Sequence, residues 1–417
     1  MYQITMLIAR TVIRAIPVMT VMLLMGATSS VANEAPSSGF PAEFVLDTLA
    51  RHPAFSAANS DLEATRAEAR SLSRPIYNPE LSAGFEQAGE DTVEIGISQT
   101  IDWSGQRSAR TALGEANLAA AQSEFEMDQR QLTAEIITAL IDFETRRDLQ
   151  SLAQNRQALT AEFLSVAQQR QNIGDVSPSA LLSARLAHAE ALADLSLIEA
   201  DLSRAQETLA VLWGEARIDW PSLPRAPGGT EVFTRPPSYE ALPELRLARA
   251  QIDITEAQIR VARADRRPNP TIGVRGGTEG DSDLLGIEIS VPLHIRNTYS
   301  AELDAAMAIR ASADQSYSIA LRRANASLTN TNARSRSALL SWQAWNESGA
   351  GSLEDQRTLL ARLWAAREIG VVEYIVQLDQ TFDAQEAGIS LRAQTWLSWV
   401  EWLVSSNQIS VWVESQQ

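Results

Sequence analysis

Two kinds of hydrophobic periodicity alternate along this chain. Within residues 80–103 and 271–295, apolar residues recur at every second position, which is typical of strands with one apolar face. Within residues 104–213 and 296–412 they recur at helical spacing, often in strict sevens. The clearest heptads are Leu195, Leu202 and Leu209, then Ile375, Phe382, Ile389, Trp396 and Leu403. Sustained heptads predict long helices that pack as coiled coils.

The alternating segments predict two β-hairpins. The first has strands at Glu80–Ala88 and Thr92–Trp103, and the second at Thr271–Thr278 and Leu284–Ile295, with polar glycine-containing turns between them. Strands of about ten residues are long enough to cross a lipid bilayer. An amphipathic hairpin on a soluble core has the same pattern, so the strands alone leave both interpretations open.

The helical segments are unusually long. No proline interrupts the sequence from about Ser104 to Ile173. Roughly 70 residues at 1.5 Å each make a rod of about 100 Å. A partner helix follows Gly174 and runs to about Trp213. Such a pair favours an extended helical hairpin over a compact globular core.

The chain is a duplication. Asn78-Pro79 matches Asn269-Pro270, a strand end near Ile97 matches one near Ile289, and Gly174 matches Gly370, at offsets of about 190 to 196 residues. We therefore predict a first repeat at 33–220, a proline-rich linker at 221–243 and a second repeat at 244–417. Each repeat is expected to contain a helix, a β-hairpin (80–103 or 271–295) and long helices (104–213 or 296–412).

The N-terminus predicts a secretory signal peptide over residues 1–32. Arg10 and Arg14 precede a short apolar stretch, and small residues lead to a cleavage site after Ala32. A membrane anchor is the alternative, but the apolar stretch is short and Pro17 interrupts it. The chain has no cysteine, which excludes disulfides and lipidation of a cysteine.

Charge and composition exclude several functions. The formal net charge is −17, or about −19 without Arg10 and Arg14, and every basic residue is arginine. Nucleic acid is not an expected partner, because its binding needs basic surface. The three histidines, His52, His188 and His294, lie apart and the few methionines are scattered, so we expect no metal site and no cofactor. The sequence places no histidine beside a nucleophile-bearing turn, and its glycine pairs do not have the pattern of a phosphate-binding loop. We therefore do not expect an enzyme.

Four strands per chain constrain the assembly. Four strands do not close a barrel, and lipid does not tolerate an open sheet edge. If the strands lie in a membrane, several chains must contribute strands to one barrel.

Three stretches resemble the TolC-like outer-membrane efflux family over essentially the whole mature chain. Residues 98–107 (SQTIDWSGQR) are similar to its strand-to-helix junction, residues 289–293 (ISVPL) to the counterpart in the second repeat, and residues 209–214 (LAVLWG) to the end of the first helical hairpin. Gln99, Gly105-Gln106-Arg107 and Leu212-Trp213-Gly214 most resemble the branch that exports cobalt, zinc and cadmium.

The resemblance implies a mixed α/β membrane protein in the outer membrane. It implies a homotrimer with a joint twelve-stranded β-barrel in outer-membrane lipid, continued by an α-helical tunnel through the periplasm. A periplasmic adaptor and an inner-membrane RND-type pump would be its partners, and the channel itself would be a passive exit duct for heavy-metal cations.

The resemblance also places a gate at the helix turns. Family members constrict that end with acidic rings, and Asp379 matches one such position, whereas Val376 replaces the other. Asp175 and Glu373 are further candidates for gate carboxylates. The same turns would contact the adaptor, which points to Gly174, Val176, Gly370 and Val371.

A soluble periplasmic coiled-coil adaptor is the alternative function. An adaptor is expected to place one helical hairpin between flanking β domains. Two complete strand–strand–helix–helix units favour the channel.

Overall fold

Long helices and one small sheet make up the described part of the chain, residues 39–88, 90–217, 219–228 and 238–417 of a computed structural model. The first half contains α1 (Ala42–Arg51), α2 (Pro53–Leu72), β1 (Glu80–Ala88), β2 (Glu90–Thr100), α3 (Gln106–Asn172) and α4 (Pro178–Trp213). The second half contains a 3₁₀ turn (Tyr239–Ala241), α5 (Pro243–Asp265), β3 (Thr271–Glu279), β4 (Ser282–Ser290), α6 (Ser300–Ala344), a π-helical segment (Trp345–Gly349), α7 (Ala350–Ala365), α8 (Val371–Ser405) and α9 (Ile409–Glu414). The predicted signal peptide, residues 1–32, lies outside the described residues.

Several predicted bounds were wrong. Strand β2 ends at Thr100 instead of Trp103, because the Asp102 carboxylate accepts the backbone N–H groups of Gln106 and Arg107 (2.9 and 2.8 Å) and starts α3. Strand β4 ends at Ser290 instead of Ile295, because Pro292 has no N–H for a strand ladder. The helix expected from residue 296 begins at Ser300 and is interrupted by the π-helical segment.

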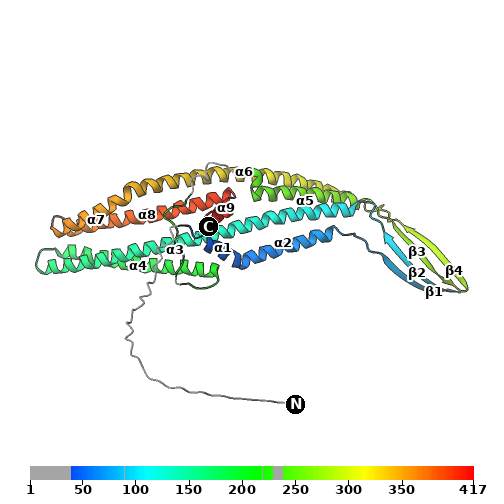
Figure 1. The fold of residues 1–417 in the computed structure, drawn as a ribbon, viewed down its shortest axis with the longest axis horizontal. Coiled ribbons are helices and arrows are strands. Elements are labelled where there is room, and N and C mark those ends of the chain that lie inside the picture. The colour runs from blue at the N-terminus through cyan, green and yellow to red at the C-terminus, as the bar shows by residue number, and fades with distance from the viewer. Residues whose placement is uncertain (1–38, 89, 218, 229–237) are drawn as a thin grey trace, which may run out of the picture. The chain divides into compact units, whose positions relative to one another are not determined.

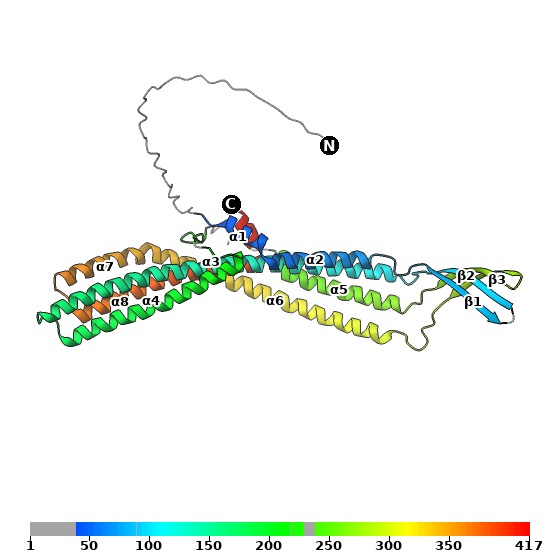
Figure 2. The ribbon, with the colours of Figure 1, turned by 90° about the horizontal axis from the view of Figure 1, so that it is seen from below.

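Helix α3 is the central element of the helical part. It packs against α2 and α5 on the side of the strands and against α4 and α8 towards the helix turns (Figures 1 and 2). The predicted heptads account for this packing. Leu202 and Leu209 of α4 and Phe382, Trp396 and Leu403 of α8 are buried, and the intervening members are partly buried.

Two hydrophobic clusters stabilise the helices. The larger one joins α1, α3, α4, α8 and α9, and its largest fully buried side chains include Trp396, Trp399, Ile136 and Leu403. Burying a side chain of this size contributes about 1.5–3 kcal/mol. The smaller cluster lies at the helix turns and is described below.

The chain between the two halves is bound to the helices through Arg392 of α8. Its guanidinium donates to the carboxylates of Glu144 (3.1 Å) and Asp148 (2.9 Å) of α3 and to the carbonyl oxygens of Leu223 and Pro224. Glu144 also accepts the backbone N–H of Leu223 at 2.6 Å. Residues 229–237 of the predicted linker lie outside the described residues.

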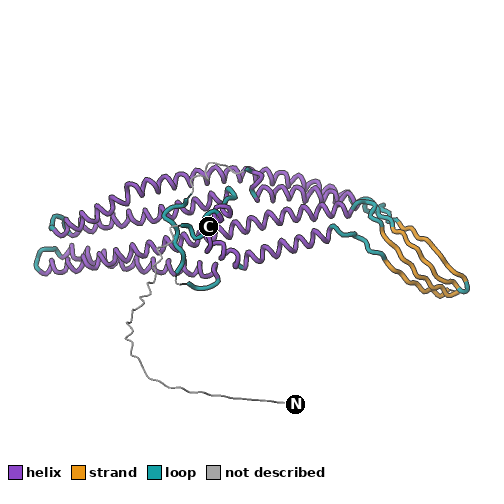
Figure 3. Tube along the Cα trace, in the orientation of Figure 1, coloured by secondary structure: helices purple, strands orange, loops and turns teal. Residues whose placement is uncertain are grey.

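The four strands form one antiparallel sheet in the order β1-β2-β3-β4, at the far end of the helices from the helix turns (Figure 3). Opposed residues share a face, so the register separates polar from apolar side chains. The apolar face is exposed in the single chain, with residues such as Leu81, Phe85, Ile95, Leu285 and Ile287. The two outer strands, β1 and β4, each have one edge that pairs with no described strand.

A polar network fixes the strands to the helices. Buried Asn269 accepts the backbone N–H of Ser104 (2.9 Å) and donates to Gln106 (3.1 Å) and to the Tyr77 hydroxyl (3.2 Å). Gln106 also donates to Asp265 at 2.7 Å. This network joins the connections of β1, β2 and β3, which explains why the junction motif contains these polar residue types.

Candidate functional site

The two helix turns lie side by side and form the candidate site. The turn between α3 and α4 contains Gly174, Asp175 and Val176, and that between α7 and α8 contains Arg367 and Gly370. The guanidinium of Arg367 lies 4.0 Å from the Asp175 carboxylate, across the two turns. The structure therefore brings the predicted gate and adaptor residues of the two repeats to one place, with Asp379 two helical turns further along α8.

The turns are equivalent in a register that differs from the predicted one. Gly174 has a left-handed backbone (φ +81°) and ends α3, and Arg367, 193 positions later, does the same for α7 (φ +61°). Ser177 caps α4, and Gly370, again 193 positions later, is the N-terminal cap of α8 with φ −82°. Pairing Gly174 with Gly370 was therefore wrong. Both residues are glycine, but they occupy different positions in the two turns.

An aromatic cluster packs between the helices next to the two turns. The rings of Phe163, Trp364 and Tyr374 are mutually stacked or tilted, with centroids 4.8 to 5.2 Å apart. The Arg170 guanidinium lies over Trp364 at 4.2 Å, a cation–π contact. These rings belong to the smaller hydrophobic cluster together with residues of α3, α4, α7 and α8. The turns are thus held to one another by the packing of this cluster and by the contact of Arg170 with Trp364.

Burial in this cluster raises the pKa of the Tyr374 phenol, because the cluster removes water from it, and the nearby Glu162 carboxylate raises it further. The phenol therefore stays neutral at physiological pH.

The predicted gate carboxylates differ in their environment. Asp379 is only partly exposed and accepts a hydrogen bond from the Arg156 guanidinium of α3 at 3.0 Å. Arg156 also contacts Asp194 (3.0 Å) and Glu190 (3.9 Å) of α4. Glu373 is exposed and accepts from the Gln377 amide at 3.3 Å. Asp379 thus joins the second helical hairpin to the first within one chain, a role that the sequence did not indicate.

The predicted adaptor contacts are only partly on the surface. Val371 is 7% exposed and belongs to the smaller hydrophobic cluster, and Val176 packs against that cluster. The exposed apolar side chains at the turns are instead Ile173, Val372 and Val376. The heptad pattern of α8 could have predicted this exposure. Leu378 and Phe382 define the buried face of the helix, and Val371 lies on that face, whereas Val372 and Val376 do not.

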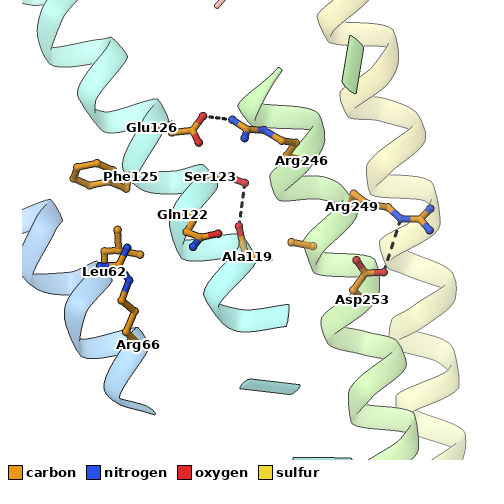
Figure 4. Close-up of a pocket in the computed structure, with 11 residues that line it drawn as sticks. Leu62, Arg66, Ala119, Gln122, Ser123, Phe125, Glu126, Arg246, Arg249 and Asp253 are labelled. Atoms are coloured by element: carbon orange, nitrogen blue, oxygen red, sulfur yellow. Dashed lines mark hydrogen bonds and ion pairs between the residues drawn. The ribbon is translucent and has the colours of Figure 1, made fainter. Parts of the chain in front are cut away.

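A groove of about 580 Å³ lies between α2, α3 and α5 (Figure 4). Its charged side chains neutralise one another, since Arg246 pairs with Glu126 and Arg249 lies 3.8 Å from Asp253. The groove contains no histidine and no nucleophile beside a base, so its lining does not suit catalysis.

The described residues offer no evident metal centre and no helical membrane span. They contain no group of three or more histidine, aspartate or glutamate side chains that could hold a metal ion. Among the same residues, no helix combines the length and the apolar character needed to cross a membrane.

Residues 45–215 match the family described as outer membrane efflux protein. The cobalt-zinc-cadmium resistance protein CzcC of Cupriavidus metallidurans is 27% identical over 262 residues, which cover 59% of this chain and 62% of that protein. The nickel-cobalt-cadmium resistance protein NccC of Alcaligenes xylosoxydans is 27% identical over 307 residues, with 68% of each chain covered. The chain therefore spans less than two thirds of the length of CzcC.

Among solved structures, the outer-membrane channel OprN superposes with a TM-score of 0.74 at 15% identity, covering 88% of this chain and 89% of that one. At this identity the likeness concerns the fold. The helices and the sheet of this chain thus have the same overall fold as that solved chain. Residues 45–215 thus form a domain similar to the outer membrane efflux protein family.

Proposed function

We propose that this protein is the outer-membrane channel subunit of a tripartite efflux pump and a passive exit duct for heavy-metal cations. The observation that carries the proposal is the sheet, whose apolar face is exposed and whose outer strands β1 and β4 lack described partners on one side. An apolar face of this kind is unfavourable in water and suits lipid, and the open edges are unfavourable in lipid unless other strands pair with them.

In this proposal, the open edges of the sheet pair between the chains of a trimer. Strand β4 of one chain pairs with β1 of the next, and three sheets of four strands close into a twelve-stranded barrel. The long helices of the three chains continue it as a tunnel into the periplasm. The exposed apolar side chains of α4, including Leu182, Leu186 and Leu197, suit contacts between neighbouring chains.

The proposed partners are a periplasmic adaptor and an inner-membrane RND-type pump. The adaptor would contact the helix turns around Gly174, Val176 and Gly370, where Ile173 and Val372 supply exposed apolar surface and Val371 supports it from within. The cargo follows from the relatives, whose names specify resistance to cobalt, zinc, cadmium and nickel. A duct of this kind performs no reaction and needs no cofactor.

The gate is part of the same proposal. Asp379, Glu373 and Asp175 would form carboxylate rings in the trimer, and rings of this kind attract cations in a narrow pore. The Arg156–Asp379 ion pair would hold the second hairpin against the first in the closed state, and its separation would accompany opening.

Fractionation of cells that express the full chain tests the proposal. We expect the processed protein in the outer membrane and a trimer by mass in mild detergent. In a strain that depends on it, deletion should raise sensitivity to cobalt, zinc or cadmium. A soluble periplasmic monomer would contradict the channel and revive the adaptor.

A further inference from the structure

An exposed arginine lies in, or directly next to, each of the four connections between a strand and a helix. Arg74 lies six residues before β1, Arg107 seven residues after β2, Arg266 and Arg267 at most five residues before β3, and Arg296 six residues after β4. Because all four connections lie at the same end of the sheet, these arginines gather at one level of the fold. We call this set the arginine collar: Arg74, Arg107, Arg266, Arg267 and Arg296.

The collar has no carboxylate partner within the described residues. Many other described arginines pair with carboxylates, as Arg156 does with Asp379 and Arg392 with Asp148. No collar guanidinium lies within ion-pair distance of an aspartate or glutamate in the described ranges. The nearby Asp102 uses both carboxylate oxygens on the N-terminus of α3. Single arginines without an ion pair to a described residue also occur on the helices, for example Arg185 on α4. In the collar five such arginines gather at one end of the sheet in a chain of net charge −17, and this clustering indicates a partner outside the chain.

Backbone contacts hold part of the collar in place. The Nε of Arg107 donates to the carbonyl oxygen of Ser73 (2.8 Å), and the Nε of Arg266 donates to that of Thr298 (3.2 Å). His294 also lies 3.2 Å from the Arg266 carbonyl oxygen, which ties the long β4–α6 connection to the end of α5. The remaining guanidinium nitrogens stay available for an external acceptor.

Exposed apolar side chains accompany the collar. Trp103 in the β2–α3 connection is 77% exposed, and Leu293 and Ile295 in the β4–α6 connection are 74% and 77% exposed. Arginine beside exposed tryptophan and aliphatic side chains is the composition of a membrane–water interface. A soluble acidic protein partner would not account for these apolar side chains as well.

The other end of the sheet has the opposite charge. Near the hairpin turns lie Glu86, Glu90, Asp91, Glu279, Asp281 and Asp283, and no described arginine accompanies them. The apolar face of the sheet lies between this acidic end and the collar. Only the collar end therefore complements a negatively charged lipid surface.

We propose that the arginine collar binds the phosphate groups of anionic phospholipids in the leaflet on the helix side of the membrane, and so sets the depth of the sheet in the bilayer. This inference rests on the proposed function, since it requires the sheet to lie in a membrane. Guanidinium–phosphate contacts are bidentate and charge-assisted. Attraction of arginines to an anionic surface decreases with salt, because the counterions screen it.

Spin-labelled lipids test the inference on the full chain reconstituted in phosphatidylcholine vesicles. Electron paramagnetic resonance measures how strongly spin-labelled phosphatidylglycerol associates with the protein relative to spin-labelled phosphatidylcholine. For the wild type at low salt, we expect phosphatidylglycerol to associate with the protein at least about twofold more strongly than phosphatidylcholine. This ratio should decrease at high salt. The variant Arg74→Gln/Arg267→Gln/Arg296→Gln should bring the ratio close to one; these three side chains make no hydrogen bond to the described residues, so the change should leave folding intact.

The matched control is Arg185→Gln/Arg322→Gln/Arg323→Gln, which removes the same charge from exposed positions on α4 and α6. It should keep the preference. Equal association of the two lipids with the wild type, or an unchanged preference in the collar variant, would overturn the inference and favour an acidic protein as the partner of the collar. Flotation with the vesicles and a cross-linked trimer are scored separately, so a protein that never inserts contradicts the proposed function instead.

Discussion

The two halves of the chain build the same turns with different residues. The first half has three left-handed helix ends at Gly105, Gly174 and Gly214, whose φ angles are between +79° and +93°. The second half has left-handed residues at the matching places, 193 or 194 positions later, and none of them is glycine: Tyr299, Arg367 and Asn407. A side chain at such an angle is strained by about 1 kcal/mol or more, and asparagine tolerates it best.

The difference shows that the fold, and not the residue type, requires a left-handed backbone at these helix ends. Each one ends or begins a helix at a position where the chain must reverse or enter the sheet junction. The first half meets the requirement with glycine and without strain, whereas the second half meets it with side chains that are strained at these angles. A second contrast lies in the helices, where α3 is continuous and the matching rod of the second half is interrupted between α6 and α7.

The largest predicted effect concerns this interruption. The Trp345 indole lies against Gly388 of α8, and a Cβ added there would be 2.6 Å from the indole nitrogen. The matching residues of the first half, 193 positions earlier, are Leu152 and Leu195. We expect Gly388→Leu to lower the free energy of unfolding by about 1–3 kcal/mol, through overpacking. Urea unfolding in mild detergent measures it.

The double variant Trp345→Leu/Gly388→Leu is the control, because it copies the first half. It should recover most of the lost stability, with a coupling between the two sites in a double-mutant cycle. Additive losses would mean that the indole does not set the interruption.

The next effect compares the glycines of the two turns. Gly174→Ala should lower the free energy of unfolding by about 1 kcal/mol, because alanine is strained at φ +81°, although no atom lies close to the added Cβ. Gly370→Ala should change it by less than about 0.5 kcal/mol, since φ −82° suits any residue. The urea midpoints of the two variants give the comparison, and equal losses would contradict the register derived from the turns.

A smaller effect of opposite sign is expected at Arg367. Arg367→Gly relieves the left-handed strain and should raise the free energy of unfolding by about 0.5 kcal/mol, after the greater flexibility of glycine in the unfolded chain is subtracted. Its contact with Asp175 at 4.0 Å is exposed and contributes little. Thermal unfolding checks the direction, with Arg362→Gly, inside α7, as a control that should destabilise.

The smallest effect appears only at alkaline pH. The raised pKa of Tyr374 means that the folded chain holds the phenol proton more tightly than the unfolded chain. Its contribution is therefore complete below the unfolded pKa of about 10 and is lost as the pH rises through the folded pKa. Tyr374→Phe should weaken the alkaline loss of stability and change little at neutral pH, and Tyr317→Phe should leave that loss in place. The first-half match of Tyr374 is Leu181, which is also buried in this cluster and cannot titrate.

The candidate site was predictable in position but not in detail. Heptads and the missing prolines locate the helix ends, and so they place Asp175, Glu373 and Asp379 near one end of the fold. The partner of Asp379 was not predictable, because Arg156 lies 223 positions away and meets it only through the packing of α3 on α8. The correct pairing of residues between the two turns was not predictable either, because the presence of glycine in both turns does not reveal the φ angle of each.

The sequence by itself determined the local order of this protein: which segments are helices or strands, that this order occurs twice, and which face of each element is apolar. Those properties follow from periodicity, which acts between near neighbours in the chain. The tertiary structure decided where β2 and β4 end, which arginines find a carboxylate and which remain in the collar, and where a side chain must accept a left-handed backbone. Those properties depend on contacts between residues far apart in sequence, whose geometry exists only after the helices have packed.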